Sequence, residues 1–161
     1  MPPQTPDKSS LIYTAFYCEE NVYYLCKTFS EILDKNKENY EIYVCFISNK
    51  TRSVPIKRQL AAKSPDGFVI WTYANESLPL VDLPEYHRKY RVVPSETFLR
   101  VFASDRSHMS KNNDSTISPP NYPPIFTAET TMNLPSFISM TENLDSADFG
   151  KVLNENEFFE F

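Results

Sequence analysis

The chain has 161 residues, of which 41% are hydrophobic and 14% aromatic. It is therefore long enough to bury one core and too apolar to be wholly disordered or fibrous. It holds only two glycines, Gly67 and Gly150, so a nucleotide-binding protein with a glycine-rich phosphate loop is almost excluded. The formal net charge is −5, which disfavours a nucleic-acid-binding protein, because such proteins present a basic surface.

One basic run, from His87 to Arg91, stands out in this acidic sequence. We interpret it as the solvated face of a strand rather than a nucleic-acid site. No apolar stretch approaches the roughly 18 residues that a membrane span needs, and the N-terminus lacks the basic start and apolar run of a secretory signal. The sequence thus predicts a cytoplasmic and nuclear protein with no membrane or nucleic-acid partner.

The chain contains three cysteines, which a reducing compartment keeps as thiols. No Cys-x-x-Cys motif occurs, and His87 and His108 are the only histidines. Along a helix, Cys18 and Cys26 lie about 12 Å apart, too far to share one metal ion. No metal site is expected.

A helix is predicted over residues 19–34, the clearest element in the chain. Its apolar side chains recur at the three- and four-residue spacing of an amphipathic helix, at Val22, Leu25, Cys26, Phe29, Ile32 and Leu33. Glu19 and Glu20 fall in its first turn, where carboxylates interact favourably with the positive end of the helix dipole.

Extended segments follow this helix, at 41–47, 54–56, 68–73 and 86–93. The first is apolar on both faces, which is typical of a central, buried strand. Pro55 has no backbone donor and places the second segment at a sheet edge or a strand end. A short helix capped by Ser95 comes next. Because the helix precedes the strands, the order indicates an α+β fold rather than alternating βαβ units.

The length of the chain predicts a single domain over residues 1–161. Residues 1–13 are expected to form a flexible N-terminal tail. Residues 103–127 are polar and proline-rich, and we expect them to form a long surface loop.

Cys18 comes immediately before the predicted helix. A thiol in that position faces unpaired N–H groups and the positive end of the dipole, which lowers its pKa and favours the nucleophilic thiolate. Cys26 falls on the apolar stripe of the helix and Cys45 within the predicted buried strand, so both are interpreted as structural.

Several motifs resemble those of the N-terminal glutamine amidohydrolases. The match begins in Tyr17-Cys18-Glu19-Glu20-Asn21-Val22 and is most specific in Phe102-Ala103-Ser104-Asp105-Arg106-Ser107-His108-Met109. The other matching segments are Val44 to Asn49, Val54 to Ile56, Phe68 to Trp71, Pro119 to Pro124, Met132 to Met140, and Gly150 with Glu157-Phe158. They follow the family's order from about residue 14 to the C-terminus.

The resemblance implies an α+β fold related to the papain and transglutaminase cores, in which the helix that carries the cysteine packs on an antiparallel sheet. It also implies a monomer that needs no cofactor or metal. Such an enzyme deamidates N-terminal glutamine to glutamate, releases ammonia and feeds arginylation in the N-degron pathway. Cys18 matches the nucleophile, while a His protonates the departing ammonia and an Asp orients that His.

The sequence departs from the family pattern after Trp71. The family continues Trp-Asp-Tyr-His-Val with the catalytic His, whereas this chain continues Thr72-Tyr73-Ala74-Asn75. Ala74 thus stands where that His belongs. Several dozen residues, including those that carry the Asp, are missing between Trp71 and Asp82. The catalytic His and Asp therefore have no match here.

Two alternatives stay open from the sequence. One is a catalytically inactive, shortened relative that at most binds N-terminal glutamine peptides or a partner; its peptide affinity would not change on Cys18→Ala. The other is a different thiol hydrolase that recruits His108 as its base. His87 and His108 also have plain structural interpretations, as a solvent-facing strand residue and a hydrogen-bonded residue near a loop.

Overall fold

A computed structural model describes residues 5–36, 40–57, 68–72, 84, 87–110, 118–142 and 147–161. Helices and antiparallel strands both occur in these residues, so the predicted α+β class is confirmed. The chain divides into two compact units, one of residues 1–44 and 93–134 and one of residues 45–92 and 135–161. The single domain over residues 1–161 stays a prediction.

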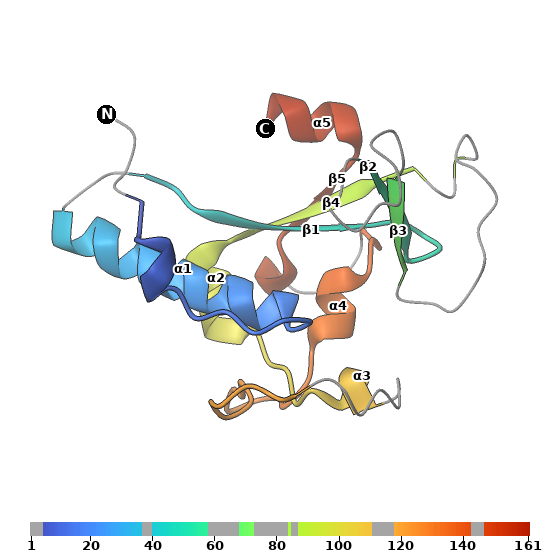
Figure 1. Ribbon diagram of the computed structural model, residues 1–161. Coiled ribbons are helices and arrows are strands. Elements are labelled where there is room, and N and C mark those ends of the chain that lie inside the picture. The colour runs from blue at the N-terminus through green and yellow to red at the C-terminus, as the bar shows by residue number, and fades with distance from the viewer. Residues whose placement is uncertain are drawn as a thin grey trace. The chain divides into compact units, whose positions relative to one another are not determined.

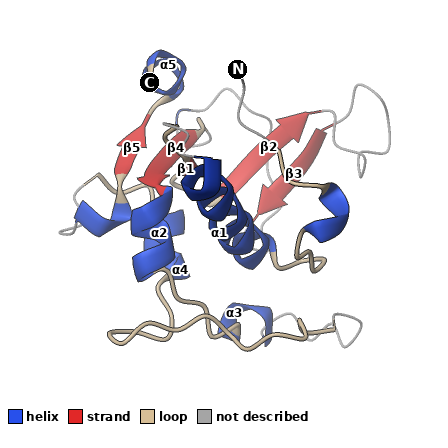
Figure 2. Cartoon of the chain, turned by 90° about the vertical axis from the view of Figure 1, so that its left-hand side faces the viewer, coloured by secondary structure: helices blue, strands red, loops and turns tan. Residues whose placement is uncertain are grey.

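The first unit is built around the helix that the sequence predicted. This helix, α1, spans Cys18–Asn36 and has Glu19 and Glu20 in its first turn. Its neighbour is the shorter helix α2, Ser95–Val101, and both views show the two helices side by side (Figures 1 and 2). The 3-10 helix η1, Lys8–Ser10, and helix α3, Ser107–Ser110, belong to the same unit.

Aromatic side chains form the contact between α1 and α2. The ring of Tyr23 lies 6.1 Å from the rings of both Phe98 and Phe102, and the two phenylalanine rings are 4.6 Å apart. Both phenylalanines are fully buried. The predicted Ser95 cap is wrong: the cap residue is Pro94, while the Ser95 N–H donates to the Ile42 carbonyl at 2.8 Å.

The side chain of Asn133 forms hydrogen bonds with the backbone at the end of α2, much as a neighbouring strand would. The Asn133 side chain accepts from the Ala103 N–H at 2.8 Å and donates to the Val101 carbonyl at 2.6 Å. One residue on, Ser104 bridges Ile125, and its N–H donates to that carbonyl at 2.8 Å. The bond to the Val101 carbonyl satisfies an acceptor that the end of α2 leaves open, and the Ser104–Ile125 bridge lies within the loop predicted over 103–127.

A three-stranded sheet in the order β1–β4–β5 has most of its residues in the second unit. Its strands are β1 (Tyr43–Ser48), β4 (Lys89–Pro94) and β5 (Lys151–Leu153). The prediction of a central β1 is wrong, because β4 takes the centre and β1 an edge. Within β1, buried and exposed residues alternate, with Cys45 and Ile47 exposed. A strand of an antiparallel sheet can pack one face on the core and expose the other to solvent, which explains this alternation.

A separate antiparallel pair joins β2 (Ser53–Lys57) to β3 (Phe68–Thr72), as Figure 2 shows. Pro55 lies opposite Ile70 in this register. Each strand has one neighbour in this sheet, so the predicted edge position of Pro55 is confirmed.

Short elements complete the second unit: helix α4 (Leu134–Ile138), the 3-10 helix η3 (Ala147–Phe149) and helix α5 (Glu155–Glu160). Helix α5 begins with a capping box, in which Asn154 and Glu157 bond each other's backbone N–H. Its Phe158 ring stacks on the buried Tyr90 ring of β4, with the ring centroids 4.2 Å apart. In the described part of the chain, no helix is both long and apolar enough to span a membrane.

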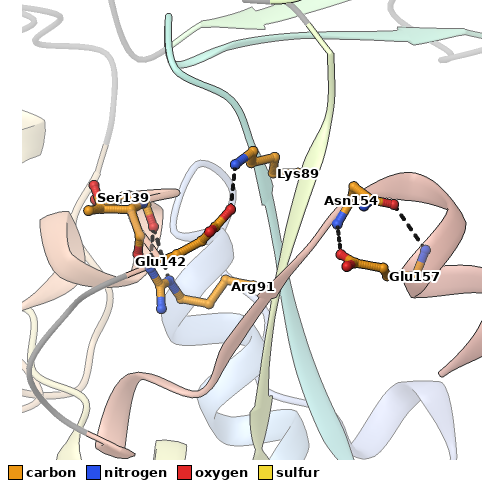
Figure 3. Close-up of polar contacts among 7 residues, drawn as sticks. Lys89, Arg91, Ser139, Glu142, Asn154 and Glu157 are labelled. Atoms are coloured by element: carbon orange, nitrogen blue, oxygen red, sulfur yellow. Dashed lines mark hydrogen bonds and ion pairs between the residues drawn. The ribbon is translucent and has the colours of Figure 1, made fainter.

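In the basic run from His87 to Arg91, the environment of Arg91 differs from the one that the sequence predicted. His87 and Arg88 are exposed, as a solvated face requires, but Arg91 is only 1% exposed. Its guanidinium donates four hydrogen bonds to three carbonyls, those of Ser139, Thr141 and Phe149. Figure 3 shows its bond to Ser139. The solvated-face interpretation is therefore wrong for Arg91, which crosslinks the segment after α4 to the central strand.

Replacing Arg91 by methionine should lower the free energy of unfolding by about 3 kcal/mol, because three partly buried carbonyls lose charged donors. Arg91→Lys should cause a smaller loss of stability, since an ammonium group keeps the charge but cannot reproduce the planar hydrogen-bond geometry of a guanidinium. The matched control is Arg88→Met, because Arg88 pairs with Glu155 at the surface; it should cost under about 1 kcal/mol. Urea unfolding measures all three, and equal stability of the two methionine variants would contradict the assignment.

Candidate active site around Cys18

Cys18 is the first residue of α1 and is an exposed, free thiol. The backbone just before it is unusual, because Phe16 has a φ of 71° while its side chain is 66% exposed. Left-handed backbone is uncommon for a bulky residue and is found often at functional sites. The turn is anchored where Thr14 and Asn21 exchange two hydrogen bonds of 2.8 Å.

The predicted low pKa of the Cys18 thiol is wrong. Partial burial of the sulfur raises this pKa above its ordinary value of 9.0, and the Glu19 carboxylate raises it further. A backbone N–H at Cys18 acts in the opposite direction but is the smallest of the three effects. Thus the helix terminus stabilises the thiolate as expected, but desolvation and a neighbouring negative charge outweigh it.

The other two cysteines differ from Cys18. Cys26 is buried, as predicted, and burial raises its pKa to about 11. Cys45 belongs to the exposed side of β1, which corrects the prediction of a buried position, although shielding of its thiol still raises the pKa to about 11. All three cysteines are free, as the sequence predicted.

Glu20, two residues after Cys18, forms a buried bidentate ion pair with Arg106. Arg106 Nε donates to Glu20 Oε1 at 2.8 Å, and Arg106 Nη2 donates to Oε2 at 2.9 Å. The Glu20 side chain is fully buried. This pairing raises the pKa of Arg106, so Arg106 carries its positive charge at every physiological pH.

Arg106 is also held between two aromatic rings. Its guanidinium carbon lies 5.6 Å from the centre of the Tyr17 ring and 5.2 Å from that of Tyr122. It donates a further hydrogen bond to the Tyr122 carbonyl at 3.0 Å. The backbone of Arg106 is left-handed, with a φ of 64°. Several contacts therefore determine one position for this guanidinium.

His108 interacts with the other carboxylate of this turn. Its Nε2 lies 3.0 Å from Glu19 Oε1. Its Nδ1 is buried and has no hydrogen-bond partner among the described residues. The structure thus places His108 beside the residue that follows Cys18, while its use as a base stays a prediction.

The sequence also singled out Ala74, Asp82 and His87. Ala74 and Asp82 lie outside the described residues, so nothing is added on the departure from the family motif. His87 is exposed just before β4, in the second unit. Where the structure describes the chain, no cluster of three or more His, Cys, Asp or Glu side chains could hold a metal ion.

Comparison with known proteins finds matches over nearly the whole chain. The family described as N-terminal glutamine amidase matches residues 13–75 and 72–161. The chain belongs to this family. Curated relatives called protein N-terminal glutamine amidohydrolase come from Danio rerio, 34% identical over 96% of this chain and 90% of the relative, and from Homo sapiens, 33% identical over 97% and 90%. A relative of that name from Oryza sativa subsp. indica is 34% identical over 96% and 88%.

The alignments also show that the relatives have residues that this chain lacks. The alignment with the Danio rerio protein runs over 192 positions, whereas the chain has 161 residues. That relative therefore has residues with no counterpart here. The two family matches meet at residues 72–75, directly after Trp71, where the sequence predicted the missing segment.

Sequence reasoning overlooked the roles of Glu20 and Arg106. Both residues lie in the two segments that most resemble the family. That resemblance was the one signal in the sequence that these residues have a role. Their partnership could not be inferred, because 86 positions separate them.

Proposed function

We propose that this protein hydrolyses the side-chain amide of an N-terminal glutamine, converting it to glutamate with release of ammonia. The observation that carries the proposal is family membership over nearly the whole chain together with a free, exposed cysteine at the start of α1. The curated relatives bear the name of this activity.

The proposed chemistry begins at Cys18. Its thiolate attacks the amide carbonyl, a C–S bond forms and the C–N bond breaks. The departing nitrogen takes up a proton and leaves as ammonia, which produces a thioester between Cys18 and the glutamine side chain. Water then attacks this thioester, yielding the glutamate carboxylate and the free thiol. No electron transfer takes place, and the reaction requires no cofactor.

The wider proposal follows from the family resemblance. The core is related to those of papain and transglutaminase, and the protein acts as a monomer in the cytoplasm and nucleus. The new N-terminal glutamate would then be arginylated, which marks the substrate protein for degradation in the N-degron pathway. Its partners are proteins and peptides that begin with glutamine.

A set of three peptides tests the substrate assignment. The first begins with glutamine, the second is the same peptide acetylated at its N-terminus, and the third carries glutamine at position two. We expect ammonia and the amide-to-acid mass change from the first peptide only. Release from all three would mean an unselective amidase. No release from folded protein, with the first peptide still bound, would mean an inactive relative that only binds.

A further inference from the structure

The motif around Arg106 is the most specific family match in the sequence, yet the proposed chemistry does not use it. In the structure it brings a guanidinium and an imidazole to the first turn of α1. Arg106 meets Glu20, and His108 meets Glu19. These two glutamates directly follow Cys18. A single short segment therefore contacts the carboxylates of the two residues that follow Cys18.

A carboxylate so near a thiol opposes formation of the thiolate, since like charges repel. Glu19 already shows this effect on Cys18. Glu20 is fully buried, where an unpaired charge acts through a low dielectric and is costly to the fold. The bidentate bond from Arg106 balances that charge and also determines the orientation of the helix turn.

We propose that the segment from Arg106 to His108 is a positioning device for Cys18: Arg106 balances the buried charge of Glu20, His108 contacts Glu19, and together they hold the helix turn in place. The proposal rests on Cys18 being the nucleophile. Arg106 and His108 act through the glutamates and are positioning residues rather than catalytic ones. The left-handed backbone of Arg106 and the rings of Tyr17 and Tyr122 fit this role, because they hold the guanidinium in one place.

The other ionisable groups near this turn include Asp105, whose carboxylate accepts from the Ser107 N–H and interacts electrostatically with His108, and several tyrosines. Tyr17 and Tyr122 face the Arg106 guanidinium, and the ring of Tyr24 lies 4.6 Å from that of Tyr122. Burial raises the pKa values of Tyr24 and Tyr122. The rings of Tyr17 and Tyr122 thus contact the same guanidinium that pairs with Glu20.

The test measures the pKa of the Cys18 thiol in the full chain, from the pH dependence of alkylation by iodoacetamide. Mass spectrometry of the peptide that contains Cys18 separates it from Cys26 and Cys45. Arg106→Met leaves Glu20 unbalanced and should raise this pKa by about half to one unit. Glu20→Gln leaves Arg106 unbalanced and should lower it by a similar amount. The double variant should return within a few tenths of a unit to wild type.

Opposite shifts in the two single variants, cancelled in the double variant, would support the proposal. A purely structural pair would lower the melting temperature of both variants but would not move the pKa in opposite directions. Unchanged pKa values, or shifts of the same sign, in folded protein would overturn it. Where Arg106→Met does not fold, Glu20→Gln alone decides, because an unchanged thiol pKa there contradicts the proposed neutralisation.

Two further variants complete the experiment. Arg106→Lys retains the charge without the planar fork, so it should keep the thiol pKa near wild type while weakening the bidentate bond. Arg91→Met is the matched control, because Arg91 is another buried arginine but lies in the other unit; it should destabilise the protein without shifting the Cys18 pKa. Alkylation needs no turnover, so an inactive wild type would refute the proposed function and leave this test intact.

Discussion

Replacing Cys18 by alanine is expected to reduce ammonia release from a peptide with N-terminal glutamine to the uncatalysed rate. The reason is that the thiolate forms the only covalent bond to the substrate in the proposed reaction. Because the pKa of Cys18 is raised above 9.0, most of the thiol is protonated at neutral pH. Activity of the wild type should therefore rise with pH until the thiol pKa is reached. Enzyme at stoichiometric concentration allows slow release to be followed.

The matched control is Cys45→Ala, which removes another thiol from the exposed side of an edge strand and should retain wild-type release. Acid quenching followed by intact-mass measurement should find a peptide thioester on wild type and none on Cys18→Ala. Equal release by wild type and Cys18→Ala would assign the activity to another group. A thioester on Cys45 would move the nucleophile out of α1.

Insertion of the missing segment is expected to raise the rate of ammonia release by about two to four orders of magnitude. The segment comes from the Danio rerio relative and enters after Trp71, where the two family matches meet. The family resemblance implies that this segment carries the Asp-Tyr-His that follows the tryptophan, where this sequence has Thr72-Tyr73-Ala74. A positioned acid–base group contributes about 10²–10⁴-fold to such a reaction.

The control for this experiment is the same insertion with its histidine changed to alanine. Both chimeras have the same length, so any effect of the insertion on folding is shared. The rate gain should disappear in the alanine version. If the two chimeras are equally fast, the inserted histidine is not the base, and His108→Ala in the original chain becomes the decisive variant. Loss of release there, with both the fold and the Cys18 thiol pKa retained, would assign the base to His108 rather than a positioning role.

The local elements of this protein could be predicted because their signals are short-range. The three- and four-residue spacing from Val22 to Leu33 determines α1 within two residues of its observed ends. Pro55 lacks a donor and so excludes a central strand position. The family resemblance, carried by contiguous motifs around Cys18 and Arg106, identified the family that the comparisons show.

Only the tertiary structure decided the environments of individual charged and thiol groups. Cys18 has a helix terminus to lower its pKa, yet the burial that folding imposes on the sulfur, with Glu19 beside it, reverses the shift. Arg91 belongs to a basic run but is buried, because three carbonyls from a distant segment converge on it. Arg106 reaches Glu20 across 86 positions. Sequence periodicity reports neighbours along the chain, whereas desolvation and ion pairing depend on neighbours in space.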